Sequence, residues 1–457
     1  ASVAWRISDE PWMGWSRRAL DNAKIRFSAG SMGNGNVSPY SYTSEMTVST
    51  ADDIVLGGSY PSYTSVGSTV PVSLTWEKST TYDVGLDLDF FNNRLSVSGD
   101  YYRRYTTDMY TASVALPAVY GTGSPKGNNA EMKTDGWELS LSWRDSFKLG
   151  GKPFDYSIKA MVWDSKSVIT KYVNDTGSLG TVKGFIENGG SPSSYYVGMT
   201  VGEIWGYTVA GLFRDQADID SSAIHDFVQA SDKVTRPGQV KIADLDGNGF
   251  IDSGNFAVDD HGDLRIIGNQ SPRYRYGVNL SARWNGIGLS VFLQGVGARD
   301  WYPGSDAGMF WGKYGRPFFA LIPSIHNYTD DMYSAERNNW DTAYWPRMTT
   351  YQSNGTKNWT RLLEIPNTRY IQSAAYLRVK NIQLDYSFPK HICSAIRLQG
   401  LKIYVNAENL FTFTPLHKYA PNFDPEGLSY DSDFASAADG YTYPILKSVT
   451  VGVNITF

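Results

Sequence analysis

The sequence has little cysteine, no long apolar run and no cluster of basic residues. Cys393 is the only cysteine, so the chain cannot form an internal disulfide, and we expect a small strand-turn residue there. No stretch approaches the ~18 apolar residues that a spanning helix needs. The mean hydropathy is -0.34. These absences exclude a disulfide scaffold and a helical membrane protein.

Basic excess and catalytic motifs are also missing. The 41 Lys and Arg residues are dispersed among 46 Asp and Glu, and the net charge is -5, whereas nucleic-acid binding requires clustered cations. The five histidines lie far apart, and the chain contains no HExxH, GxSxG or CxxC pattern. We therefore expect no nucleic-acid partner and no enzyme activity.

The C-terminal segment 446–457, LKSVTVGVNITF, is the clearest structural signal. Alternate residues from Val449 to Phe457 are apolar, and the residues between them are small and polar or Gly. A strand with an apolar face, an opposite polar face and a terminal Phe fits the wall of a transmembrane barrel, with lipid outside and water in the lumen. The 31 Tyr, 20 Phe, 14 Trp and 44 Gly residues fit the same architecture.

The same alternation recurs along the chain. In YDVGLDLDF at 82–90, one face is apolar and the other carries Asp83, Asp87 and Asp89, which a dry protein core would not accept. Together with the C-terminal segment, the predicted strands cover 2–7, 24–31, 82–90, 95–102, 137–143, 156–162, 274–284, 287–293, 376–388 and 401–411. In 376–388 the apolar phase shifts, which predicts a β-bulge near Lys380 and Asn381.

Short and long connections alternate between these strands. Tight turns are expected at 91–94, 145–153 and 285–286, and long connections at 112–132, 165–271, 299–374 and 414–445. In outer-membrane barrels the short turns are periplasmic and the long loops extracellular. The count of roughly eleven strands is odd, whereas bacterial barrels normally have an even number. We therefore expect residues 1–457 to be part of a larger barrel.

Several blocks of the sequence resemble the SusC-like family of TonB-dependent outer-membrane transporters. They are LTWEKSTTYDVGLDLDFFNNRLSVSGDYYRRYTTDMY at 74–110, NNAEMKTDGWELSLSW at 128–143, PGQVKIADLDGNGFID at 237–252, RIIGNQSPRYRYGVNLSARWNGIGLSVFLQGVGARDWY at 265–302, AAYLRVKNIQLDYSFP at 374–389 and LKIYVNAENLFTF at 401–413. The resemblance implies an all-β fold, a transmembrane antiparallel β-barrel of ~22 strands around an N-terminal plug. On this comparison, 1–457 is the C-terminal half of the barrel, and the plug and the N-terminal strands lie outside the sequence.

The resemblance also implies a function and a set of partners. Members of the family import oligosaccharides or oligopeptides across the Gram-negative outer membrane, with a SusD-like surface lipoprotein as a lid and with energy supplied by TonB-ExbB-ExbD. The residues slightly favour oligosaccharides, because Trp and Tyr are dense in the predicted loops. The partners would be the N-terminal plug half, outer-membrane lipid and the lid. The alternatives are a siderophore or vitamin receptor of the TonB-dependent class and a non-transporting barrel that acts as an adhesin or porin.

One motif suggests a cation. DLDGNGFID at 244–252 matches the start of an EF-hand-like loop, with Gly249 at the sharp turn. Position 12 is Asn255 where a full loop has Glu, so Asp259 or Asp260 is a candidate for the missing carboxylate. A polar turn closed by side-chain hydrogen bonds is the alternative. The predicted ligands of a structural Ca²⁺ are the side chains of Asp244, Asp246, Asn248 and Asp252 and the carbonyl of Phe250.

The loop after 287–298 is rich in aromatic residues. Trp301, Tyr302, Trp311 and Tyr314 are candidates for contact with substrate or with the lid, because Trp and Tyr provide large contact areas with a polar group. A loop of this length must also bury apolar side chains to keep a shape, so packing within the loop is the competing interpretation.

Overall fold

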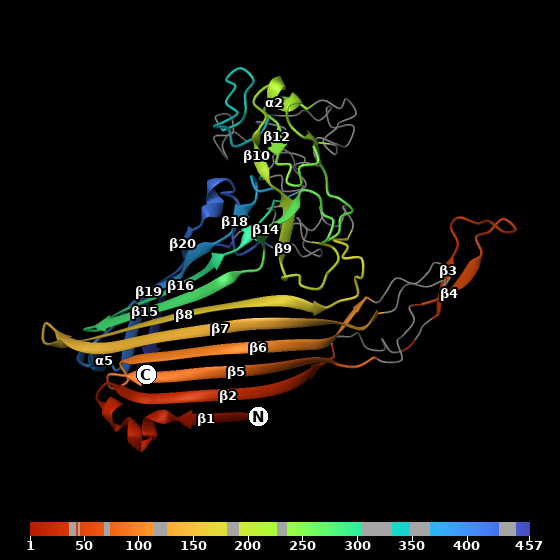
Figure 1. Ribbon diagram of the computed structural model, residues 1–457. Coiled ribbons are helices and arrows are strands. Elements are labelled where there is room, and N and C mark those ends of the chain that lie inside the picture. Colours follow the sequence, from red (N-terminus) through yellow and green to blue (C-terminus); the bar gives the residue numbers. More distant parts are fainter. Residues whose placement is uncertain are drawn as a thin grey trace.

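Eleven strands of the computed structural model form one antiparallel sheet in which the order of the strands follows the chain (Figure 1). The structure describes residues 1–35, 43, 46–67, 74–112, 126–180, 192–225, 235–303, 310, 331–347, 366–428 and 445–457. In sheet order the strands are β1 (Ser2–Arg6), β2 (Leu20–Asn34), β5 (Glu77–Phe90), β6 (Leu95–Ala112), β7 (Lys126–Leu149), β8 (Lys152–Lys171), β15 (Arg273–Trp284), β16 (Ile287–Ala298), β19 (Tyr376–Ser387), β20 (Gly400–Phe413) and β21 (Ser448–Thr456). Each strand predicted from alternation is present.

Tight connections lie at one rim of the sheet. The β5–β6 turn contains Phe91, Asn92 and Asn93, all with φ near +60°, and the β15–β16 turn is Asn285-Gly286. The turn expected over 145–153 is only Gly150-Gly151, because β7 and β8 stay paired as far as Leu149 and Lys152. The same rim carries η1 (Ile7–Asp9) and η2 (Pro11–Arg18) between β1 and β2, and α5 (Lys390–Ala395) between β19 and β20.

The predicted bulge is confirmed at Lys380. Val379 and Asn381 pair with consecutive residues of β16, Leu293 and Phe292, so Lys380 is an extra residue in β19. The register against β20 shifts at the same place. The bulge explains why the apolar phase of this segment changes.

The two faces of the sheet differ in chemistry. Many side chains on one face, here called the apolar face, are exposed, such as Leu86 at 41% and Val451 at 74%. The opposite face, here called the polar face, carries charged residues such as Arg26, Asp87 and Asp100, which are joined in ion pairs. An exposed apolar surface of this extent is typical of a wall in contact with lipid.

Most of the buried apolar core lies outside the sheet, in folded loops at the rim opposite the tight turns (Figure 1). These loops, here called the loop assembly, comprise the described residues of 172–272, 299–375 and 414–428. Their small elements are β9 (Glu203–Tyr207) with β14 (Leu264–Asn269), β10 (Val209–Leu212) with β12 (Val240–Ile242), β11 (Ile224–His225) with β13 (Phe250–Ile251), β17 (Asp300–Trp301) with β18 (Gln372–Ser373), α2 (Gln216–Asp220) and η6 (Pro415–Lys418). The first long loop therefore begins after Lys171, later than residue 165, because β8 continues past the apolar part of its sequence.

A hairpin that alternation did not identify projects from the same rim. β3 (Met46–Thr50) pairs with β4 (Ser62–Val66) between β2 and β5, and in Figure 1 the hairpin extends away from the rest of the molecule. Among the helices of the described ranges, none combines the length and apolar character required to cross a membrane.

Candidate functional site

The polar face carries an ion-pair network that crosses three strands. Arg26 on β2 donates from Nε to Asp87 Oδ2 on β5 at 2.8 Å, and its Nη2 lies 2.9 Å from Asp100 Oδ1 on β6. Lys24 Nζ lies 3.1 Å from Asp87. Gly85 leaves room for this crossing, since a Cβ there would lie 2.6 Å from Arg26 Cζ. The network fixes charged groups on a half-exposed wall, where they are available to a polar solute.

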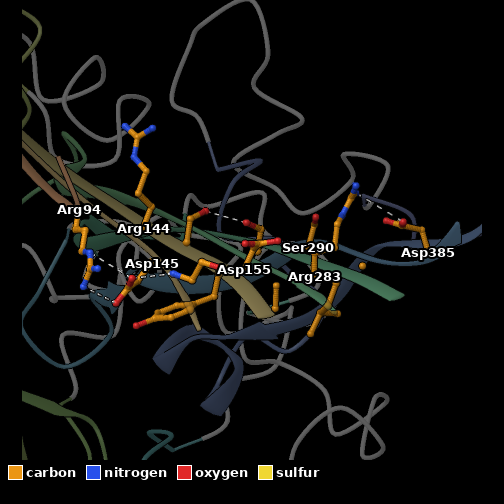
Figure 2. A pocket seen from close by; sticks show the side chains of 14 residues that line it. Arg94, Arg144, Asp145, Asp155, Arg283, Ser290 and Asp385 are labelled. Atoms are coloured by element: carbon orange, nitrogen blue, oxygen red, sulfur yellow. Dashed lines mark hydrogen bonds and ion pairs between the residues drawn. The ribbon is translucent and has the colours of Figure 1, made fainter. Parts of the chain in front are cut away.

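A hollow of about 700 Å³ is lined by residues near the tight turns of the sheet. Figure 2 shows its lining side chains. β7, β8, β15, β16 and β19 all contribute residues to it, and its charged lining residues are Arg94, Arg144, Arg283, Asp145, Asp155 and Asp385. Asp385 is only 5% exposed, and Lys402 Nζ lies 3.3 Å from its Oδ1. Arg283 Nη2 approaches Asp385 Oδ2 at 3.9 Å. The hollow thus offers both hydrogen-bond donors and acceptors on the polar face.

The loop after β20 is held against the sheet by ion pairs. Arg378 on β19 is 3% exposed at its side chain and lies 2.6 Å from Asp424, and it also pairs with Glu426. Lys380, the bulge residue, places Nζ 2.8 Å from Glu426 Oε1. Gln294 on β16 donates to the same carboxylate at 3.2 Å. The bulge therefore has a role, since its side chain helps to anchor this loop.

The acidic loop at 244–252 folds as a tight turn around its own carboxylates. Asp244 accepts hydrogen bonds from the N–H groups of Gly247 at 2.6 Å and Gly249 at 2.9 Å, and the pKa of its carboxyl is lowered mainly by the Gly249 bond. The Asn248 side chain donates to Asp246 at 3.1 Å and to Asp252 at 3.3 Å. Phe250 contributes a backbone N–H to Asn248 Oδ1 at 2.7 Å.

Asp263 completes the acidic cluster. Carboxylate oxygens of Asp244, Asp246 and Asp263 lie within 4.8 Å of one another, and Asp263 is fully buried. Asp263 Oδ1 accepts from Leu245 N–H at 2.6 Å, and burial, together with the two nearby carboxylates, raises the pKa of Asp263. Asp260 instead accepts a hydrogen bond from the Asn255 side chain. The cluster offers hard oxygen ligands of the kind that Ca²⁺ prefers.

Two of the four aromatic residues expected at a contact surface, Trp301 and Tyr302, lie in the core. Trp301 is 1% exposed and Tyr302 is fully buried, and the Tyr302 hydroxyl accepts a hydrogen bond from the Asn367 side chain at 2.9 Å. This burial corrects the expectation of surface contact for these two residues, because a loop assembly must bury apolar area to hold its shape. Trp311 and Tyr314 lie outside the described residues.

Sequence reasoning did not identify Asp263, Asp385 or Arg378 as site residues. Asp263 lies outside the nine-residue motif and comes close only because β13 and β14 bring their ends together. Asp385 and Arg378 occupy polar positions of β19, where alternation predicts a wet face but does not identify partners. The sequence feature that could have indicated Asp385 and Arg378 is a charged residue at a strand position that faces the barrel lumen.

Comparisons with known proteins agree with this architecture. A family model described as "TonB dependent receptor-like, beta-barrel" matches residues 1–259. The chain is 26% identical over 464 residues to TonB-dependent receptor P3 of Formosa agariphila, an alignment that covers 100% of this chain and 41% of that protein. It is 24% identical over 464 residues to TonB-dependent receptor SusC of Bacteroides thetaiotaomicron, with 100% and 39% coverage.

Solved structures show the same fold. The RagAB peptide importer in the "closed-closed" state matches with a TM-score of 0.70 and 20% identity, covering 100% of this chain and 43% of that one. The structure of the RagAB peptide transporter matches with a TM-score of 0.66 and 18% identity, covering 100% and 42%. The chain spans about two fifths of the length of the curated relatives that it matches.

Proposed function

The chain belongs to the TonB dependent receptor-like β-barrel family, and from this premise we propose that it works in active import of oligomeric nutrients across the Gram-negative outer membrane. It would supply the C-terminal half of the barrel of a longer transporter, with the plug in the other half and energy supplied by TonB-ExbB-ExbD. The coverage of 41% of a curated relative supports this assignment. The family's outer-membrane location supports the compartment.

The observation that carries the proposal is the contrast between the two faces of the sheet. One face exposes Leu86 and Val451 to the surroundings, and the other holds Arg26 between Asp87 and Asp100. A wall with lipid on one side and water on the other requires this division, because charges are costly in hydrocarbon. A polar, ion-paired inner wall suits a path for hydrophilic cargo.

A SusD-like surface lipoprotein is the proposed lid partner, and the β3–β4 hairpin is a candidate surface for it. The hairpin exposes apolar side chains that are between 52% and 70% accessible: Met46, Val48, Ile54, Val55, Leu56, Tyr60 and Tyr63. Clustered exposed apolar residues on an external projection favour a protein interface. The long loops would then be extracellular, at the rim opposite the tight turns.

We propose oligosaccharides as cargo because the loop sequences are rich in Trp and Tyr besides the buried Trp301 and Tyr302, with oligopeptides as the second candidate. The peptide alternative is supported by the solved structures of similar fold, which are those of the RagAB peptide importer and the RagAB peptide transporter. Both classes need many polar contacts, and the ion pairs of the polar face and the hollow lined by Arg283 and Asp385 supply donors and acceptors for either one.

We also propose that the acidic loop holds a structural Ca²⁺. Asp244, Asp246 and the buried Asp263 would provide carboxylate oxygens, and Asn248 and Asp252 lie beside them. The ion would neutralise carboxylates that repel one another and would hold β13 and β14 together. Its role would be to stiffen the loop assembly.

Uptake by cells that carry the intact transporter tests the proposed function. Labelled oligosaccharides and labelled oligopeptides of matched size would be supplied to cells with and without the transporter, and to cells without TonB. Accumulation of one class that requires both proteins is the expected result. Equal accumulation in the TonB-deficient cells would contradict active import. Mass spectrometry of proteins co-purified with the transporter identifies the lid.

A further inference from the structure

A cross-strand row marks the place where the apolar face changes to charged residues. Five directly paired residues from β2, β5, β6, β7 and β8 form this row: Ala29, Tyr82, Arg103, Asp135 and Lys166. The neighbouring row on the tight-turn side has apolar or aromatic residues on its first four strands, Phe27, Val84, Tyr101 and Trp137, and ends in Asp164 on β8. Aromatic residues followed by charges are typical of the edge of a membrane's apolar layer.

The charges at this edge do not balance. Arg103, Lys133, Asp135 and Lys166, here called the rim patch, carry three positive charges and one negative charge. Arg103 Nε lies 2.5 Å from Asp135 Oδ1, and Lys133 Nζ lies 3.3 Å from Asp135 Oδ2. Lys166 lies directly opposite Asp135 in the β7–β8 register. Asp135 forms ion pairs with two of the three cations, Arg103 and Lys133, so the rim patch carries a net positive charge at the edge of the apolar face.

The neighbouring ion pair shows that such an excess is not required by the fold. Asp164, two residues before Lys166 on β8, pairs with Arg273 at 2.5 Å, one anion to one cation. The rim patch therefore has unneutralised positive charge with which an additional anionic group can pair, whereas the Asp164–Arg273 pair has none.

An apolar groove of about 560 Å³ adjoins the rim patch. Val3, Phe27, Ala29, Tyr82, Val84, Tyr101 and Arg103 are among the residues that line it. Ala29 is the small residue of the row, and the larger side chains of Phe27, Tyr82 and Tyr101 stand around it. Arg103 belongs to both features, so a cationic group stands at the edge of an apolar groove.

We infer that the groove and the rim patch together bind one phosphorylated lipid of the outer leaflet. An acyl chain would lie in the groove against Phe27 and Val84, and a phosphate would meet Arg103 and Lys166. Guanidinium and ammonium groups are the usual partners of phosphate, and basic residues at a membrane surface attract anionic lipids. The inference goes beyond import and rests on the proposed function only for the membrane location.

Two features favour a lipid over free phosphate as the ligand. The groove gives the acyl chain an apolar surface beside the cations, whereas a free ion would gain nothing from it. Tyr82 and Tyr101 combine an apolar ring with a hydroxyl and suit the headgroup level. The Tyr101 hydroxyl donates to Asp135 at 3.1 Å and so holds the carboxylate at this level.

Native mass spectrometry of the intact detergent-purified transporter tests the inference. The probes are bisphosphorylated lipid A, the same lipid with its phosphates removed, and inorganic phosphate. Lys166→Gln should weaken binding of the bisphosphorylated lipid about fivefold, and Lys133→Gln with Lys166→Gln about 25-fold. Ala29→Trp, which fills the groove without altering charge, should weaken binding of both lipids.

Lys152→Gln is the matched control, since Lys152 lies in β8 at the tight-turn rim. It should leave lipid binding unchanged. Equal binding of the two lipids to the unaltered transporter, or equal weakening by Lys152→Gln and Lys166→Gln, would overturn the phosphate assignment. Inorganic phosphate that binds as tightly as the lipid would overturn the lipid assignment. Lys166→Gln leaves the Arg103–Asp135 pair intact, so its effect does not depend on loss of that contact.

Discussion

Arg378 and Asp424 form an ion pair of 2.6 Å although the Arg378 side chain is only 3% exposed. The pair joins wall strand β19 to the loop after β20, and Glu426 and Lys380 extend it. A buried charge needs such partners, because desolvation of an unpaired ion costs several kcal/mol. The loop is therefore tied to the sheet by charge as well as by apolar packing.

Arg378→Met should release this loop. Without the Arg378 cation, the largely buried carboxylates of Asp424 and Glu426 have less positive charge to neutralise them. We expect local stability to fall by about 3 kcal/mol. Hydrogen exchange of the described residues 415–428 in the intact transporter measures the change. Arg6→Met is the control, since the Arg6–Asp9 pair is 60% and 66% exposed, and its loss should cost roughly 1 kcal/mol or less. Equal protection of the loop in both variants would contradict the anchoring role.

Calcium should stabilise the acidic loop through Asp246 and Asp263. At a free Ca²⁺ concentration about 100 times its dissociation constant, binding should add about 2.7 kcal/mol to local stability. Asp246→Ala or Asp263→Asn should remove most of this gain, and Asp259→Asn should keep it. Hydrogen exchange with and without chelator gives the comparison. Identical protection of the unaltered loop under the two conditions would show that the turn is held by hydrogen bonds alone.

Asp300 should make the stability of the loop assembly depend on pH. Burial raises the pKa of its carboxyl above 3.8, and its Oδ2 accepts a hydrogen bond from Asn269 N–H at 2.9 Å. Because the folded-state pKa is the higher one, its contribution is fully present below pH 3.8 and is lost as pH rises through the raised pKa. Asp300→Asn should remove that part of the pH dependence, measured by exchange at Asn269. The exposed Asp341→Asn should not.

Gly206→Ala should disrupt the contact between β9 and the segment after 365. A Cβ at Gly206 would lie 2.2 Å from the Pro366 carbonyl oxygen, which also accepts a hydrogen bond from Tyr207 N–H at 2.9 Å. The Pro366 backbone cannot move away as a flexible side chain could, so we expect the unfolding free energy to fall by about 1–3 kcal/mol. Gly30→Ala, with no atom within 4 Å of the added carbon, is the control for chemical denaturation.

Trp301→Ala should lower the stability of the loop assembly, and any effect on ligand binding should follow from that loss. The side chain is 1% exposed and packs on Phe423, with 4.8 Å between ring centroids, so its truncation should cost about 3–5 kcal/mol. Trp15→Ala, which removes a ring that is 78% exposed, should cost far less. Protease sensitivity of the loops distinguishes the two. A Trp301→Ala variant with unchanged loop stability and lost cargo binding would restore the contact interpretation.

The sequence by itself determined the strands and their two faces. Alternation has a period of two residues, which is a local property, and in β21 or β5 it identifies both the strand and the side that meets water. The bulge at Lys380 was also predictable, because one extra residue shifts that phase. The tight turns followed from Asn285-Gly286 and from the short gap between β5 and β6.

Only the tertiary structure decided which distant groups meet. Asp263 joins Asp244 and Asp246 because the loop returns between β13 and β14, and no spacing rule places it there. Trp301 and Tyr302 become core residues because other loops cover them, whereas an aromatic-rich sequence is equally consistent with a contact surface. Arg378 finds Asp424 across 46 residues of chain. Such contacts depend on how loops close over one another, which the local period of a sequence does not encode.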